Sequence, residues 1–306
     1  MTMKVQTAFV LAAAALVVLA LAPLFIPDYW TGVLLGMTGY VTLATAWAMF
    51  SGPTRYVSLA TVAFFGVGAY TVAVLNEAMP YPLVLLCAAG IGMALALVVG
   101  LSTLRLAGVY FVIFTFGLAE LVRQLVSWWE VNVTYTMGRY VFLPFEGRHI
   151  YWQLLALAAV TLLISWAIGR SRLGLALKAV GDDETVAAHA GVDVTRIKLL
   201  LFVISATIIT LVGAIQAPRW TYIEPSIVFN PTVSFMTLIM ALLGGAMRLW
   251  GPLVGAVPLF LLFEWLSVSF PDHFSIILGL LFILIVFVMP NGVLARLEDL
   301  RKGGRA

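Results

Sequence analysis

Residues 82–104 read PLVLLCAAGIGMALALVVGLSTL, a stretch that contains no charged side chain. A helix rises about 1.5 Å per residue, so about 20 residues cross a hydrocarbon core of roughly 30 Å. Backbone in lipid has no water to bond, so it must satisfy its own hydrogen bonds and form a helix. We therefore predict a membrane-spanning helix over residues 82–104.

Similar apolar runs fill most of the 306 residues. Hydrophobic residues make up 63% of the chain and charged residues 10%, whereas a soluble domain carries about 25% charged residues. We predict an all-α fold, a polytopic transmembrane helical bundle that forms a single membrane domain over residues 1–306. About ten spans are expected, at residues 5–26, 32–50, 57–76, 82–104, 109–128, 150–169, 198–217, 232–249, 252–270 and 273–290.

The basic residues indicate the orientation, because Lys and Arg concentrate in cytoplasmic loops. With ten spans and a cytoplasmic N-terminus, thirteen of the 17 Lys and Arg residues fall on the inside and three on the outside. The remaining one, Arg123, lies within a span. We therefore expect the N- and C-termini to be cytoplasmic.

A long outer loop, residues 129–149, carries aromatic side chains among mixed charges, including Tyr135, Tyr140 and Phe142. Aromatic residues gather at membrane–water interfaces, so they are explained by an interfacial belt. The alternative is a docking surface for an extracytoplasmic partner.

A long inner loop, residues 170–197, has the pattern of two short helices. The first is expected to end at Val180, before a glycine. Asp182 or Asp183 then offers an N-cap oxygen to the second helix, and Gly191 suits a left-handed C-cap.

The second of these helices has a small, apolar middle at residues 186–190, which suits insertion into a groove on another protein. The loop is expected to be held at the membrane surface by four basic residues, Arg170, Arg172, Arg196 and Lys198. The alternative is an ordinary interfacial loop whose charges only set the topology.

Three charged residues, Glu120, Arg123 and Glu264, stand inside otherwise apolar spans. Such residues are costly in lipid and face a bundle interior or a pathway. Glu120 and Arg123 are three positions apart and share a helix face, so they can pair. By their depth along the helices, all three are expected to meet in one network. That network either lines the transport pathway or fixes the helix register.

Catalytic, metal and nucleotide-binding chemistry has no support in the sequence. Cys87 is the only cysteine, and the histidines, His149, His189 and His273, have no ligand spacing. No catalytic constellation, metal site or cofactor is expected. The chain also has no GxxxxGK[ST] phosphate loop, so any ATP hydrolysis must come from a partner.

Several motifs together carry a family resemblance. They are GLALKAV at residues 174–180 with TRIKL at 195–199, AFFGVGAY at 63–70, GVYF at 108–111 with GLAELVR at 117–123, WGPLVGA at 250–256, and MPNG at 289–292. Across residues 30–297 the chain resembles the branched-chain amino-acid ABC transporter permeases, specifically the LivM-type subunit.

The resemblance implies a transport subunit rather than an enzyme, with multiple spans in the bacterial inner membrane. Its implied partners are a sister permease subunit, two cytoplasmic ATPase subunits, a periplasmic substrate-binding protein and the surrounding membrane lipid, without nucleic acid. The inner loop would be the ATPase-coupling segment, with Gly174, Lys178, Asp183, Glu184, Ala187, Ala188 and Gly191 as its residues.

The substrate is less well defined than the family. Ala60 and Thr61 follow Ser58–Leu59, where the family has Gly-His, and the outer loop has no Thr-Gly-Gly-rich stretch. The candidate substrates are therefore branched-chain amino acids, related amino acids, urea and short amides. From another class, a stand-alone channel or secondary transporter is the alternative, although no internal repeat supports it.

Overall fold

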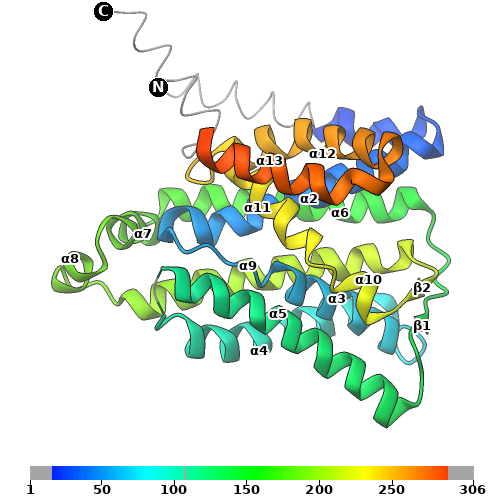
Figure 1. Ribbon diagram of the computed structural model, residues 1–306, viewed down its shortest axis with the longest axis horizontal. Helices are drawn as coiled ribbons and strands as arrows, with labels where there is room; N and C mark the ends of the chain where they lie inside the picture. Colours follow the sequence, from blue (N-terminus) through cyan, green and yellow to red (C-terminus); the bar gives the residue numbers. More distant parts are fainter. Residues whose placement is uncertain (1–15, 107, 289–306) are drawn as a thin grey trace, which may run out of the picture.

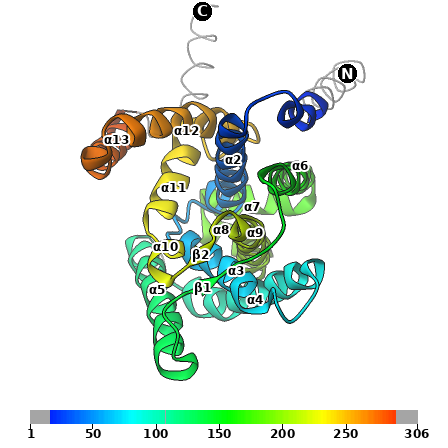
Figure 2. The ribbon, with the colours of Figure 1, turned by 90° about the vertical axis from the view of Figure 1, so that its right-hand side faces the viewer.

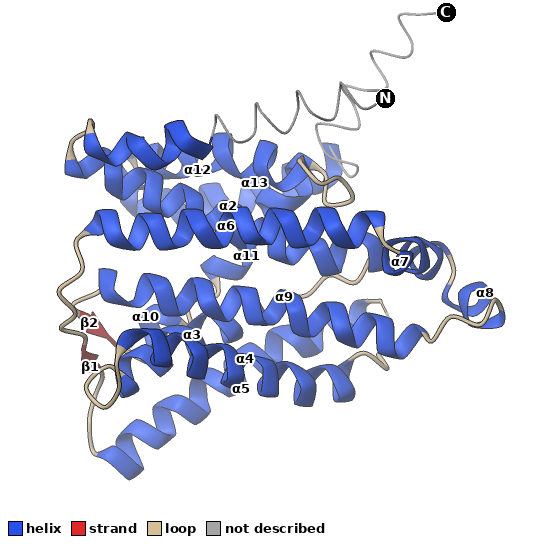
Figure 3. Cartoon of the chain, turned by 180° about the vertical axis from the view of Figure 1, so that it is seen from behind, coloured by secondary structure: helices blue, strands red, loops and turns tan. Residues whose placement is uncertain are grey.

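The computed structural model describes residues 16–106 and 108–288. Most of its long helices run lengthwise in the view of Figure 1, and a few are inclined to that direction. A short helical pair, α7 (Arg172–Asp182) and α8 (Glu184–His189), projects at one end of the bundle, and a two-stranded sheet lies at the other end (Figures 1 and 3). The arrangement is that of an all-α, multi-pass membrane protein.

The main helices, in chain order, are α2 (Asp28–Thr54), α3 (Thr61–Leu75), α4 (Tyr81–Thr103), α5 (Val109–Trp129), α6 (Gly147–Arg170), α7 (Arg172–Asp182), α8 (Glu184–His189), α9 (Val194–Gln216), α10 (Pro225–Val228), α11 (Thr232–Gly244), α12 (Gly251–Ser269) and α13 (Phe274–Val288). The shorter elements are η1 (Ala22–Leu24), η2 (Glu130–Thr134), η3 (Ala217–Arg219), η4 (Pro271–His273), β1 (Arg139–Tyr140) and β2 (Tyr222–Ile223).

Nine of the ten predicted spans overlap helices, although α11 ends at Gly244, before the predicted end of the span 232–249. Of the tenth predicted span, residues 5–26, the first half, residues 5–15, lies outside the described residues. Within the described part of the chain, seven helical segments are long and apolar enough to cross a membrane. Two further apolar helices are shorter, Thr61–Leu75 and Ile276–Ile285. The count of about ten spans and the cytoplasmic termini stay predictions.

Helices α2 and α9 form the centre of the bundle. The apolar window of α2 is 83% buried, and α2 packs against α6, α9, α11 and α12. Helix α9 packs in turn against α3 and α4. Figure 2, which looks along the helices, shows α2 and α9 with the other helices around them. These two helices therefore connect the two sides of the molecule.

The predicted span 57–76 starts too early, because α3 begins only at Thr61. Residues 55–60 are a non-helical connection, defined here as the α2–α3 connection, and its last three residues are buried. Side chains from three helices satisfy its backbone. Trp47 Nε1 donates to Ser58 O at 2.7 Å, Leu59 N to Thr115 Oγ1 at 3.1 Å, and Ser234 Oγ to Leu59 O at 2.9 Å. The connection thereby joins α2, α5 and α11.

Helices α3 and α9 approach so closely that only glycine fits at their crossing. A Cβ at Gly68 would overlap the carbonyl oxygen of Thr210, and one at Gly213 would overlap that of Phe65. Small residues allow such contacts between helices in lipid, where close packing replaces the hydrophobic effect as the driving force. The crossing therefore depends on both glycines.

Replacing Gly213 with alanine should lower the free energy of unfolding by about 1–3 kcal/mol, because the methyl group forces the two backbones apart. The apparent unfolding midpoint in detergent measures this loss. Gly117→Ala is the matched control, since nothing lies within 4 Å of its added methyl group. Equal midpoints for the two variants would contradict the close crossing.

Candidate functional site

The inner loop forms two helices, as predicted, but the first is longer than expected. Helix α7 runs to Asp182 and not to Val180. Asp183 is the N-cap of α8, where its Oδ1 accepts hydrogen bonds from Thr185 N at 2.8 Å and Val186 N at 3.1 Å. These two amides, Val186 first, hold the pKa of the Asp183 carboxyl below its usual value. After α8, Gly191 has a φ of +85°, as its expected C-cap role requires.

Helix α7 lies directly against the end of α2. A Cβ at Gly181 would overlap the carbonyl oxygen of Pro53, so the glycine allows this approach and the helix continues through it. Next to it, Arg55 pairs with Asp182 at 3.1 Å across the surface. The inner face of α7, which includes Gly174 and Leu177, is buried. The first half of the loop is therefore part of the bundle.

Lys198 ties α8 to the rest of the protein. Its ammonium lies 2.6 Å from Glu184 Oε1 and donates to the Tyr56 hydroxyl at 3.0 Å. It also lies 4.3 Å from the centroid of the Tyr56 ring. The Lys198 side chain is only 3% exposed, so the prediction that it anchors the loop at the membrane surface is wrong. It binds α8 to α9 and to the α2–α3 connection instead.

The residues predicted for coupling divide into a buried group and an exposed group. Gly174 and Ala187 are buried within the chain. Lys178, Asp183, Ala188 and Gly191 are exposed, and Glu184 is half-exposed while it pairs with Lys198. The large apolar side chains left on the outside are Leu175, 70% exposed, and Val186, 65% exposed. A partner protein would meet Val186 rather than Ala187.

The charges on α5 pair as predicted. Arg123 Nε donates to Glu120 Oε2 at 2.9 Å, and Gln124 Nε2 donates to Glu120 Oε1 at 3.0 Å. These three side chains lie on the outward face of α5, beside the exposed residues Leu121 and Leu125. The opposite face of the helix is buried in the bundle. A polar cluster thus sits on an otherwise apolar outer surface.

Glu264 does not join this cluster, so the predicted network of three charges is wrong. Glu264 lies on α12, and Figures 1 and 2 place α12 and α5 on opposite sides of the molecule. Helix α11 packs against both α12 and α2. Depth along a helix gives the height of a residue in the bundle, but it does not give the neighbouring helix.

An ion pair with a buried carboxylate, at the sheet end of the bundle, was not predicted. Glu130 is 2% exposed, accepts a hydrogen bond from Gly138 N at 3.1 Å, and lies 3.6 Å from Arg139 Nε. The Arg139 guanidinium also lies 5.2 Å from the centroid of the Trp129 ring. Arg139 begins β1, which pairs with β2. The sequence shows only mixed charges here, because the partners come together through the fold.

Exposed aromatic residues lie in the same loop as this ion pair, residues 129–149. Tyr135 is 86% and Phe142 72% exposed, and Phe142 stacks on Tyr140. An interfacial belt and a docking surface both fit this exposure, so the two alternatives remain. In the described part of the chain, no group of three His, Cys, Asp or Glu residues is placed to hold a metal ion.

Comparison with known proteins relates the chain to a transporter family. The family model for the branched-chain amino acid transport system permease component matches residues 29–286. The high-affinity branched-chain amino acid transport system permease protein LivM of Salmonella typhimurium is 28% identical over 288 residues, which cover 83% of this chain and 67% of that protein. LivM of Escherichia coli is 28% identical over 318 residues, which cover 92% and 73%.

A second kind of relative matches part of the chain. The permease protein LivH of the same named system in Salmonella typhimurium is 32% identical over 148 residues, covering 47% of this chain and 45% of that protein. No solved structure gives a significant match.

Replacing Lys198 with methionine should open α8, because Glu184 and the Tyr56 hydroxyl lose their partner. We expect the free energy of local opening at residues 183–191 to fall by about 1–3 kcal/mol. Hydrogen exchange measures this quantity.

The matched control is Arg196→Met, since Arg196 is 88% exposed and its pair with Asp193 should contribute less than about 1 kcal/mol. Exchanging the two charges, Glu184→Lys with Lys198→Glu, should restore part of the protection. Unchanged exchange in Lys198→Met would show that α8 is held by other contacts.

Proposed function

Because the chain belongs to the branched-chain amino acid transport system permease family, we propose that it is the LivM-type membrane subunit of an ABC importer in a bacterial inner membrane. Its proposed substrates are branched-chain or related amino acids. The observation that carries the ATP-driven part of this proposal is the α7–α8 segment. It projects at one end of the bundle and is anchored to α2 and α9.

The proposed partners are a sister permease, two ATPase subunits and a substrate-binding protein. Relatives named LivM and LivH are both permease proteins of one named transport system, which supports pairing with a sister subunit. The ATPases would dock on the α7–α8 segment. The binding protein would approach the other end, where Tyr135, Tyr140 and Phe142 are exposed.

Movement of a docked ATPase can reach the bundle by short paths. Asp183 and Glu184 start α8, and Glu184 connects through Lys198 to Tyr56. Asp182 connects separately to Arg55. Both paths end in the α2–α3 connection, so a shift of α8 would act directly on α2 and α3.

A charge on the solvent-exposed face of α8 should prevent ATPase docking without disturbing the fold of the chain. We expect Val186→Glu to lose the ATPase subunits on co-purification from native membranes, because a carboxylate would be buried in an apolar interface. Glu184→Lys is a poorer probe, because it also breaks the pair with Lys198.

Met137→Glu is the matched control, since Met137 is 81% exposed in the outer loop. It should keep the ATPases. Recovery of the ATPases with Val186→Glu would remove the assignment of α8, and their absence from wild-type preparations would favour a stand-alone channel or secondary transporter.

We further propose that Glu120 and Arg123 line the transport pathway. A zwitterionic amino acid presents one charge of each sign, and the pair on the exposed face of α5 offers both. Urea and short amides are neutral, so this pair suits them less well. The pathway would then run beside α5, between this chain and the sister subunit.

Replacing Arg123 with methionine should lower the initial rate of amino-acid uptake at least about tenfold, equivalent to about 1.4 kcal/mol of lost interaction with the substrate. Uptake into vesicles is measured together with recovery of the assembled complex. Leu125→Met, which changes a 57% exposed neighbour, is the control. Normal uptake with Arg123→Met would mean that the pair only sets the position of the helix.

A further inference from the structure

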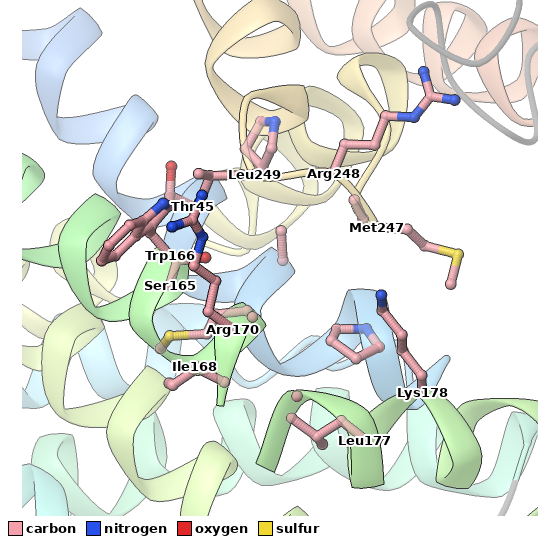
Figure 4. Close-up of a pocket in the computed structure, with 17 residues that line it drawn as sticks. Thr45, Ser165, Trp166, Ile168, Arg170, Leu177, Lys178, Met247, Arg248 and Leu249 are labelled. Atoms are coloured by element: carbon pink, nitrogen blue, oxygen red, sulfur yellow. The ribbon is translucent and has the colours of Figure 1, made fainter. Parts of the chain in front are cut away.

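A cavity of about 270 Å³ lies beside the α7–α8 segment, on the side that faces the bundle. Figure 4 shows it between the end of α2, the end of α6, the start of α7 and the connection from α11 to α12. Its walls are largely apolar, with Met49, Ile168, Leu177 and Leu249 among them. The cavity is therefore built from parts of the chain that are far apart in sequence.

Among the described residues, the charged side chains that line the cavity are all basic. They are Arg170, Lys178 and Arg248. Arg170 and Lys178 rise from opposite sides in Figure 4, whereas Arg248 extends away from both. The Arg170 guanidinium lies 4.5 Å from the centroid of the Trp166 ring, which orients it. Two cations and an apolar wall suit an anion that carries an apolar part.

We infer that this cavity binds the phosphate headgroup of an anionic phospholipid from the cytoplasmic leaflet. Basic pockets between membrane helices on the cytoplasmic side recognise such headgroups. Arg and Lys both bind phosphate, and Arg does so through paired N–H donors. This inference rests on the orientation in the proposed function, which places this end of the bundle at the cytoplasmic side of the membrane. It does not require ATP coupling.

The size of the cavity and its surroundings favour a lipid over a free anion. Drug-sized ligands occupy about 300–1,000 Å³, so a cavity of about 270 Å³ accepts a headgroup and not a whole lipid. Two of the lining side chains, Trp166 at 44% and Met247 at 64%, are exposed, and Leu163, three residues before Trp166 on α6, is 57% exposed. Acyl chains would lie against these residues. A bound lipid would thus brace α7 against α6 and the α11–α12 connection.

Native mass spectrometry of the full chain, with phosphatidylglycerol and phosphatidylcholine in competition, tests this inference. Wild type should prefer phosphatidylglycerol about 25-fold, since each of two basic side chains contributes about fivefold. The double variant Arg170→Gln/Lys178→Gln should lose the preference. The double variant Arg172→Gln/Arg196→Gln removes the same charge from exposed positions that do not line the cavity, and it should keep the preference.

A second variant guards against a folding defect. Met247→Glu places an acid in the cavity wall at an exposed position and should reduce phosphatidylglycerol binding to the level of phosphatidylcholine. Equal binding of the two lipids by wild type would overturn the inference, as would equal loss in both double variants. Displacement of the lipid by millimolar inorganic phosphate would identify a free-anion site. A cavity variant that keeps its lipid preference but loses the ATPases would identify a protein-docking site.

Discussion

The α2–α3 connection must satisfy its backbone hydrogen bonds inside the helical bundle, and much of the structure depends on how it does so. Ser58, Leu59 and Ala60 are buried without being helical. Each unpaired group there would cost about 1–3 kcal/mol, and irregular backbone in a membrane protein is tolerated only where protein or water satisfies it. Trp47, Thr115 and Ser234 supply the partners from α2, α5 and α11. These bonds fix the three helices relative to one another and set the first residue of α3.

The same connection also receives the contacts of the α7–α8 segment. Arg55 pairs with Asp182, and Tyr56 accepts a hydrogen bond from Lys198, which binds Glu184. One end of the connection is thus tied to a projecting surface and the other end to the packed core. Because buried hydrogen bonds resist extension, a displacement of α8 would be passed to α2, α5 and α11 together. In the proposed coupling, the α2–α3 connection, rather than α8 alone, would therefore transmit the movement to the bundle.

Much of the helix content could be predicted from apolar runs. Residues 82–104 were expected as a span and α4 covers Tyr81–Thr103, since a helix is the only way to hide this backbone in lipid. The N-cap at Asp183 was also predictable, because capping is local. The contacts of Lys198 and Glu264 were not, because they depend on which helices are neighbours. A lysine in a basic loop resembles a surface anchor until the fold brings Glu184 and Tyr56 to it.

The outer surface of α5 indicates that the chain by itself is an incomplete assembly. An ion pair facing hydrocarbon is unfavourable, so such residues face other protein or a water-filled cavity. Glu120 and Arg123 lie on an exposed face, and their mutual hydrogen bonds satisfy only part of their polar groups. In the membrane this face therefore needs a protein or aqueous neighbour. Packing against the proposed second permease would supply one and would leave a polar pathway between the two subunits, whereas the exposed side chains of α12, on the far side, are mostly apolar.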